Sequence, residues 1–180
     1  MSDPQTLFDS LAAIHADKRL PPVGRWHPER EGRIDIRIAA DGVWYHEGAP
    51  IKRPAMVRLF STVLRKDPDG YCLVTPNEKL LIEVEDAPFV AIDLEVKGSG
   101  RDSELMFVTN VEDCVVADRL HALRVSERNG QPRPYVHVRD GLDALISRAV
   151  FYRLVDLGIE EGNECCVYSR GERFSLGCIT

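Results

Sequence analysis

Short stretches in which apolar and polar residues alternate run through most of the chain and indicate β-strands. In the clearest of them, Ile34, Ile36 and Ile38 alternate with Asp35 and Arg37. Because successive side chains of a strand point to opposite faces, this pattern is typical of a strand with one buried face. Similar apolar runs predict further strands at residues 43–46, 71–75, 79–85, 89–96, 104–109, 114–117, 122–126, 135–138, 164–168 and 173–176.

Three segments instead carry apolar residues three and four positions apart, which predicts amphipathic helices. The first covers residues 4–16 and follows Asp3, a residue that favours helix starts. The second covers residues 54–65 and is stopped by a D-P-D-G turn. The third covers residues 142–157, and Gly158 is its natural C-terminal stop. Many strands with few helices predict an α+β fold with mostly antiparallel sheets.

A succession of strand, Asp-Gly turn and helix occurs twice and predicts an internal duplication. The helix motif I-x-R-x-x-x-x-R-L is present in both copies and places Arg53 and Arg148 at corresponding positions. Amphipathic helices also share such patterns by chance, which is the alternative. We therefore predict two duplicated β-α-β halves. The expected halves are residues 1–79, with the N-terminal helix, and the larger residues 80–180.

Charge and composition narrow the classes of partner. The 180 residues are 44% hydrophobic and carry a formal net charge of −6, which speaks against DNA or an anionic membrane as a partner. No apolar stretch approaches the roughly 20 residues of a spanning helix, and the first residues lack the pattern of a secretory leader. The five cysteines are odd in number and form no C-x-x-C motif, which favours a reducing compartment. We expect a cytoplasmic protein.

The sequence lacks the common catalytic and cofactor-binding motifs. It contains no G-x-S-x-G, no P-loop and no dinucleotide-binding glycine motif after a strand. The five histidines are scattered without metal-ligand spacing. The acidic residues at 83, 85, 86, 93 and 95 fit a solvated strand face better than a cation site. These patterns predict neither a metal nor a cofactor.

Several specific motifs resemble an uncharacterised bacterial family, the domain of unknown function number 1285. The resemblance covers nearly the whole chain after the N-terminal helix. It is carried by Trp26 and Pro28, and then by I-D-I-R-I-A-x-D-G at residues 34–42, G-x-P-I-x-R at 48–53, V-R-L-F-S-x-V-L at 57–64, L-V-T-P-x-E-K at 73–79 and V-E-D-A-P-F at 84–89.

The resemblance implies a fold and suggests a ligand. The family's fold is an internal duplication whose C-terminal half is similar to a pleckstrin-homology barrel. Its members have no established activity. A nucleotide-like small ligand between the two halves, and a role in signalling or stress response, have been suggested for the family. The resemblance thus agrees with the duplication found in the sequence but does not identify a ligand.

Basic and polar residues at strand ends, turns and helix starts form the candidate site. Arginine binds anions as a bidentate fork, and helix starts present free amides to them. We expect an anion-favouring wall formed by Arg37, Arg53, Lys79 and Arg139. Orienting polar groups would come from Thr75, Glu78 and Asn110, and one apolar face from Trp44. The alternatives are that the arginines form salt bridges with Asp35, Glu78, Glu85 and Asp86, that Thr75 only closes its turn, and that Trp44 covers the edge of the core.

The leading functional hypothesis is a non-enzymatic protein that binds or senses a small molecule in a cleft between two duplicated halves. The expected ligand is anionic or nucleotide-like. One alternative is an enzyme of unrecognised type that uses Glu78 or Asp86 as a general acid or base. The other is a protein–protein interaction module that binds a partner through strand edges or helices.

Overall fold

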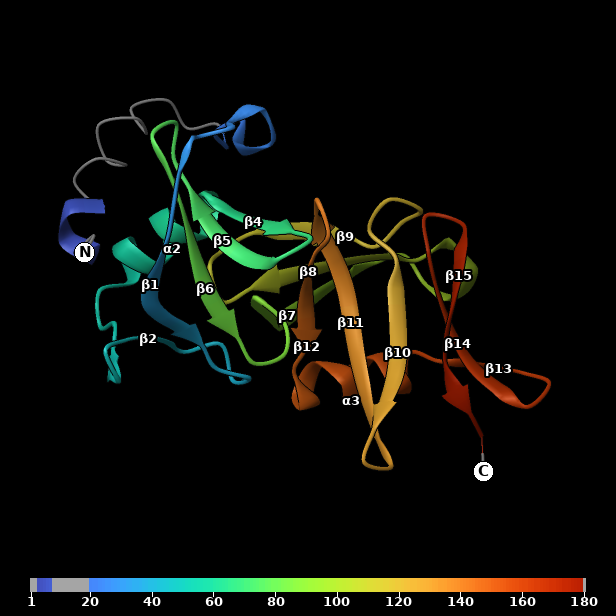
Figure 1. Cartoon of the computed structure of the whole chain (residues 1–180). Coiled ribbons are helices and arrows are strands. Elements are labelled where there is room, and N and C mark those ends of the chain that lie inside the picture. Colours follow the sequence, from blue (N-terminus) through green and yellow to red (C-terminus); the bar gives the residue numbers. More distant parts are fainter. Residues whose placement is uncertain (1–2, 8–19, 180) are drawn as a thin grey trace. The chain divides into compact units, whose positions relative to one another are not determined.

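The computed structural model describes residues 3–7 and 20–179 of the chain (Figure 1). It divides into two compact units, Met1–Asp86 and Ala87–Thr180. The division thus falls after Asp86, whereas the sequence placed it after residue 79, within the strand Glu78–Val84. Of the predicted N-terminal helix, residues 4–7 are helical, and residues 8–16 lie outside the described residues.

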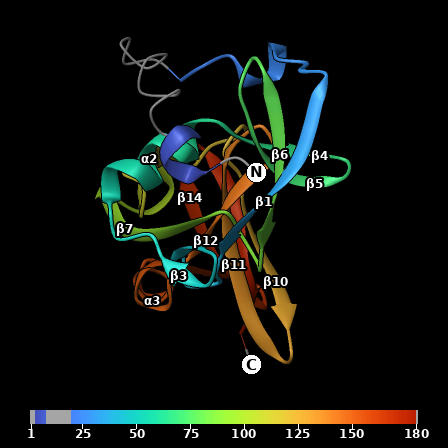
Figure 2. The ribbon, with the colours of Figure 1, turned by 60° about the vertical axis from the view of Figure 1, so that its left-hand side comes forward.

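The first unit is built on one six-stranded sheet with the order β3-β2-β1-β6-β5-β4. Strands β1 and β6 are parallel neighbours and run side by side in both views (Figures 1 and 2), whereas the other neighbours are antiparallel. The elements are η1 Val23–Arg25, β1 Arg30–Ile38, β2 Trp44–His46, β3 Ala49–Pro50, α2 Pro54–Thr62, β4 Leu64–Asp67, β5 Gly70–Val74 and β6 Glu78–Val84.

Helix α2 is shorter than the predicted helix 54–65. It begins with Pro54, whose fixed φ suits the first helical turn. The helix ends before Val63, whose carbonyl accepts a hydrogen bond from the Val74 amide, and Leu64 already pairs with Leu73 in the β4–β5 hairpin. The apolar residues at the end of the predicted helix therefore belong to the sheet, because hairpin pairing overrides the helical pattern.

The second unit contains two sheets. A six-stranded sheet has the order β10-β11-β12-β7-β8-β9, with β7 and β12 parallel, and a three-stranded sheet has the order β13-β14-β15. The elements are β7 Phe89–Lys97, η2 Gly100–Asp102, β8 Glu104–Thr109, β9 Cys114–Val116, β10 Leu123–Arg128, β11 Gln131–Arg139, β12 Leu142–Ile146, α3 Arg148–Asp156, β13 Ile159–Glu161, β14 Glu164–Ser169 and β15 Glu172–Cys178.

The predicted helix 142–157 is wrong in its first turns, which form strand β12. Leu142, Ala144 and Ile146 are buried in alternation and pair with β11 and β7, so the local pattern follows a strand period. Helix α3 starts only after Ser147, whose hydroxyl accepts a hydrogen bond from the Val150 amide and caps the helix. Apolar residues at these positions fit both periods, and the two neighbouring strands decide between them.

The order of elements is consistent with the predicted duplication. Each unit contains three strands, a nine-residue helix and three more strands: β1-β2-β3-α2-β4-β5-β6 and β10-β11-β12-α3-β13-β14-β15. An Asp-Gly pair forms the turn after β1 and after β11, and Gly42 and Gly141 have positive φ. The two units are similar mostly-β domains with few helices, so the class is richer in β-structure than the predicted α+β.

Candidate functional site

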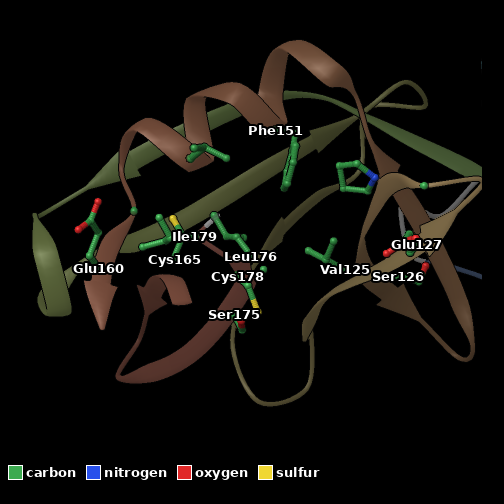
Figure 3. A pocket seen from close by; sticks show the side chains of 15 residues that line it. Val125, Ser126, Glu127, Phe151, Glu160, Cys165, Ser175, Leu176, Cys178 and Ile179 are labelled. Carbon is green, nitrogen blue, oxygen red and sulfur yellow. The ribbon is translucent and has the colours of Figure 1, made fainter. Parts of the chain in front are cut away.

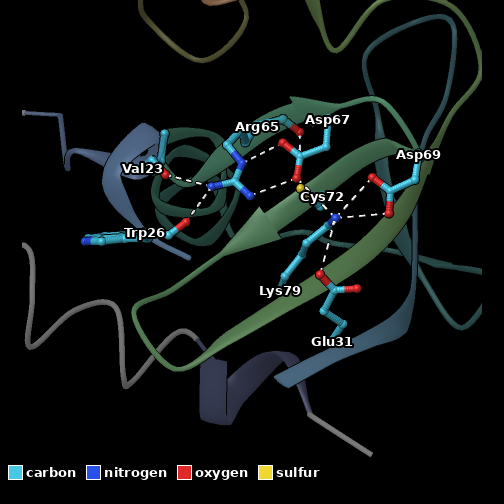
Figure 4. A network of polar contacts seen from close by, with 8 residues as sticks. All are labelled: Val23, Trp26, Glu31, Arg65, Asp67, Asp69, Cys72 and Lys79. Atoms are coloured by element: carbon cyan, nitrogen blue, oxygen red, sulfur yellow. Dashed lines mark hydrogen bonds and ion pairs between the residues drawn. The ribbon is translucent and has the colours of Figure 1, made fainter. Parts of the chain in front are cut away.

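Lys79, predicted as an anion-binding residue, instead faces carboxylates of its own unit (Figure 4). Its side chain is only 10% exposed. The Nζ atom lies 3.0 Å from Asp69 Oδ2, 3.1 Å from Asp67 Oδ2 and 3.8 Å from Glu31 Oε1. These contacts raise the pKa of Lys79, chiefly through the hydrogen bonds to Asp69, and keep the amine charged. The ammonium group therefore neutralises acidic side chains of the first unit.

Arg65 completes this network and joins it to the chain before β1. Its Nε and Nη2 atoms donate to Asp67 Oδ1 and Oδ2 at 2.7 and 2.8 Å, a bidentate pair, and Nη1 donates to the carbonyls of Val23 and Trp26 at 2.8 Å each. The hydrogen bond from Arg65 holds the pKa of Asp67 below its usual value. Burial raises the pKa of Cys72, which lies beside the network, to about 11.

Arg37 and Trp44 are also engaged within the first unit. The Arg37 guanidinium forms an ion pair with Glu85 and lies 4.5 Å from the ring centroid of Tyr45. Trp44 is 1% exposed, and its ring centroid is 6.3 Å from that of Phe60. The indole of Trp44 is thus a core group, and a stacking face for a ligand would require it to be open to solvent.

The remaining predicted residues of the first unit lie at a helix start and a turn. Arg53 directly precedes α2, and its Nη1 donates to Gln5 Oε1 at 3.0 Å. The Thr75 hydroxyl accepts hydrogen bonds from the amides of Asn77 and Glu78 at 3.2 and 3.1 Å, and so closes the turn between β5 and β6. Such a bond is the structural role of a threonine in a turn.

Asn110 and Arg139 belong to the second unit and bind its own chain. Asn110 Oδ1 accepts a hydrogen bond from the Val90 amide at 2.9 Å. The Arg139 guanidinium pairs with Asp113 and lies 5.1 Å from the ring centroid of Phe89. The eight predicted residues are thus divided between the two units. Arg37, Lys79 and Arg139 form ion pairs within their own unit, and Thr75 closes its turn. A ligand cleft between the halves stays a prediction.

The sequence did not indicate a hollow of about 760 Å³ within the second unit (Figure 3). It lies between β10, β15 and α3, and Phe151 points into it from the helix. Strand β10 is an edge of the six-stranded sheet and β15 an edge of the three-stranded sheet. The lining combines apolar and polar groups, and its side chains include Val125, Phe151, Val155, Leu176, Ile179, Cys165, Cys178, Ser126, Ser175, Glu127 and Glu160.

Gly158 keeps one wall of this larger hollow close to α3. A Cβ atom at this position would lie 2.2 Å from Cys165 Sγ and 2.8 Å from the Val155 carbonyl oxygen. Both distances are far below van der Waals contact, so only glycine fits between the end of α3 and β14. The residue that the sequence marks as a helix stop is thereby also a packing requirement of the hollow.

A smaller hollow of about 360 Å³ adjoins the larger one, because Pro132 and Phe151 line both. Its charged lining residues are Arg133 on β11 and Arg148 at the start of α3. The two hollows therefore differ in charge, since the charged residues of the larger one are both acidic. Arg148 belongs to the repeated motif of the sequence, but the hollow is formed by residues 131–134, 145–148, 151 and 152, which local patterns do not bring together.

Two carboxyl groups with lowered pKa values lie in an ion-pair network outside these hollows. Glu161 has a pKa of about 2, held there by hydrogen bonds from the Tyr168 hydroxyl and from Arg173 and Arg101. Hydrogen bonds from Arg173 likewise lower the pKa of Glu164. These groups are ionised acceptors in a surface network and are poor proton donors at neutral pH.

The described part of the chain contains neither a metal-binding cluster nor a membrane-spanning helix. Among residues 3–7 and 20–179, no three His, Cys, Asp or Glu side chains gather as a metal-binding group. No helix in those same ranges has both the length and the hydropathy needed to cross a bilayer. All five cysteines are free thiols.

Fold and hollows together define a duplicated, mostly-β protein with adjoining cavities in its second unit. Family profiles match both units: "Domain of unknown function (DUF1285), N-terminal domain" matches residues 21–87, and "Protein of unknown function (DUF1285), C-terminal domain" matches residues 88–176. The chain belongs to the DUF1285 family.

Two solved structures of the same family are similar to this chain. A DUF1285 family protein from Silicibacter pomeroyi DSS-3 is 47% identical, with a TM-score of 0.91, over 99% of this chain and 97% of that one. A DUF1285 family protein from Shewanella baltica OS155 is 26% identical, with a TM-score of 0.53, over 68% of this chain and 91% of that one. No match is found among curated proteins.

Proposed function

We propose that the protein is a non-enzymatic small-molecule-binding protein whose ligand occupies the larger hollow of the second unit. The observation that carries the proposal is the hollow itself. Its volume of about 760 Å³ lies within the roughly 300–1,000 Å³ typical of small-molecule sites. Apolar side chains line it together with hydroxyl, thiol and carboxylate groups, a combination that can hold and orient a small molecule.

The position of the hollow supports a ligand that joins separate parts of the unit. Residues of β10, β15 and α3 line it, and these elements come from two sheets and a helix. A bound molecule would contact all three and would favour the state in which they are close together. Ligand binding would thereby stabilise the second unit, which is the property that a sensing protein requires.

The ionisation of side chains favours binding over catalysis. A general acid at neutral pH needs a raised carboxyl pKa, whereas Glu161 and Asp67 are shifted downward by their hydrogen-bond donors. A thiol nucleophile needs a lowered pKa, whereas burial raises the pKa of Cys72 and Cys166. These shifts are the ones that ion pairing and core packing produce.

The resemblance to the family adds two further elements to the proposal. A role of the binding protein in signalling or stress response is compatible with ligand-dependent stability. A pleckstrin-homology-like barrel in the second half would be compatible with a six-stranded sheet, a helix and a smaller sheet around one hollow. Cytoplasmic localisation belongs to the same proposal.

A thermal-stability screen with a filled-hollow variant tests the proposal. Val125 lies on β10 and lines the hollow, so Val125→Trp should fill it, whereas Val96→Trp places the same ring at a 37% exposed position on β7 outside it. Neutral, cationic and anionic small molecules are screened for an increase in melting temperature. We expect compounds that stabilise the wild type and Val96→Trp but not Val125→Trp. The proposal fails if no compound stabilises the wild type, or if every hit stabilises Val125→Trp equally.

A further inference from the structure

The two adjoining hollows of the second unit are lined by side chains of opposite character. The larger one is lined by apolar side chains of β10, α3 and β15 together with polar groups, and its charged residues are Glu127 and Glu160, which lie at its opposite ends (Figure 3). The charged residues of the smaller hollow are Arg133 and Arg148. Pro132 and Phe151 line both hollows, which places the two spaces next to each other.

Arg148 is available for a ligand in a way that most arginines of the unit are not. Ion pairs with carboxylates engage Arg101, Arg124, Arg139, Arg153, Arg170 and Arg173. Arg148 is exposed and forms no such pair with any carboxylate of the described residues. A guanidinium group without a carboxylate partner can bind an incoming carboxylate through two parallel hydrogen bonds.

The position of Arg148 in helix α3 gives a second reason to expect an anion at this residue. It is the first residue of α3, where the helix dipole is positive and disfavours a cation. Ser147 already caps this end through its hydroxyl, so the arginine adds nothing to the cap. A bound anion would offset the repulsion between Arg148 and the helix end, whereas fold stability alone gives no reason for a cation there.

From these observations we infer that the ligand is a free anionic amphiphile, an alkyl carboxylate whose chain fills the larger hollow and whose head group binds Arg148 and Arg133 in the smaller one. The inference rests on the proposed function and gives the ligand its chemical class. The acidic residues of the larger hollow repel the carboxylate and so fix the direction in which the molecule enters. The apolar lining removes the alkyl chain from water and supplies the main driving force.

Three ligands with the same alkyl chain and different head groups test the inference. Decanoate, decanol and decyltrimethylammonium, all at concentrations at which they are monomeric, are titrated calorimetrically into the full chain at neutral pH. We expect decanoate to bind at least about tenfold more tightly than decanol, since a charge-assisted hydrogen bond is worth that factor or more. The cationic ligand should bind most weakly. Equal binding of decanoate and decanol, or no binding of decanoate, overturns the inference.

Substitutions at Arg148 identify the head-group site. Arg148→Gln should weaken decanoate about tenfold and leave decanol unchanged, whereas Arg148→Lys should retain part of the preference. Arg119→Gln removes the same charge from an exposed arginine that lines neither hollow and should leave both ligands unchanged. The inference is wrong if Arg148→Gln weakens both ligands equally or if Arg119→Gln has the same effect.

Two further comparisons distinguish a failure of this inference from a failure of the proposed function, and binding of a free ligand from binding to a lipid surface. If decanol binds the wild type but not Val125→Trp while decanoate binds no more tightly, the hollow binds ligands and only the anionic class is refuted. If neither binds and the screen yields no hit, both proposals fail. Sedimentation with phosphatidylglycerol vesicles should show no association; association without binding of monomeric decanoate would assign the arginines to a lipid surface instead.

Discussion

Replacement of Arg65 by glutamine should destabilise the first unit strongly, because one guanidinium group holds three partners. It binds both oxygens of Asp67 and the carbonyls of Val23 and Trp26. The side chains of Arg65 and Asp67 are each 16% exposed, so that the pair is closer to a buried one than to a surface one. Loss of one partner costs about 3–5 kcal/mol in a fully buried pair and about 0–1 kcal/mol at the surface. We expect a loss of about 2–4 kcal/mol in the free energy of unfolding.

Tryptophan fluorescence during urea denaturation measures this loss of stability in the first unit. The protein has two tryptophans, Trp26 and Trp44, and both lie in the first unit. The control is Arg33→Gln, which removes the same charge from an exposed position on β1 and should change stability by less than about 0.5 kcal/mol. A lower midpoint at an unchanged slope would report a change in stability of the first unit.

A double substitution tests the physical reason. Much of the cost of Arg65→Gln should come from the carboxylate of Asp67 left without its main donor. The additional change Asp67→Asn removes that charge and should recover part of the lost stability. The reasoning is refuted if Arg65→Gln is no more destabilising than Arg33→Gln, or if the double variant is as unstable as the sum of the two single variants.

Three further outcomes are expected. Tyr168→Phe removes the hydrogen bond that lowers the pKa of Glu161 most, and NMR titration should show this pKa rising from about 2 toward 4.5. Because the pKa is lower in the folded state, the stabilisation by Glu161 is complete above about pH 4.5 and is lost as the pH falls toward 2. An unchanged pKa in Tyr168→Phe would contradict the assignment. Gly158→Ala should lower the free energy of unfolding by about 1–3 kcal/mol, measured by denaturation followed by circular dichroism, because the added methyl group would clash with Cys165 Sγ and a carbonyl oxygen. Gly24→Ala, with open space around it, should leave the free energy of unfolding nearly unchanged. Ellman's reagent should modify the exposed Cys114 and Cys178 quickly and the buried Cys72 and Cys166 only on unfolding, with the modified sites located by peptide mapping. Equal modification rates for Cys72 and Cys114 would disprove this difference in access.

The strands and turns were predictable because their signals are local. The alternation of Ile34, Ile36 and Ile38 is the buried face of β1, and each Asp-Gly pair lies at the turn between adjacent antiparallel strands. The repeated order of strand, turn and helix also followed from the sequence, since turn chemistry and the side-chain period depend on few neighbouring residues.

The ends of the helices were less predictable, because neighbouring strands compete for the same apolar residues. Leu142 and Ile146 suit one face of a helix as well as one face of a strand, and pairing with β7 and β11 selects the strand. At the end of α2, pairing of Leu64 with Leu73 has the same effect. Tertiary pairing therefore decided where each helix begins or ends, and made the protein more β-rich than its sequence pattern indicated.

The sequence by itself determined the family, the repeated order of elements and the identity of the charged residues, because each of these depends on residues close together in the chain. Only the tertiary structure decided which charges are neutralised and where space remains. Lys79 meets Asp67 and Asp69 through the pairing of β4, β5 and β6. The hollows arise where two sheets and α3 pack incompletely, a property of surfaces that come together only on folding and that no local pattern encodes.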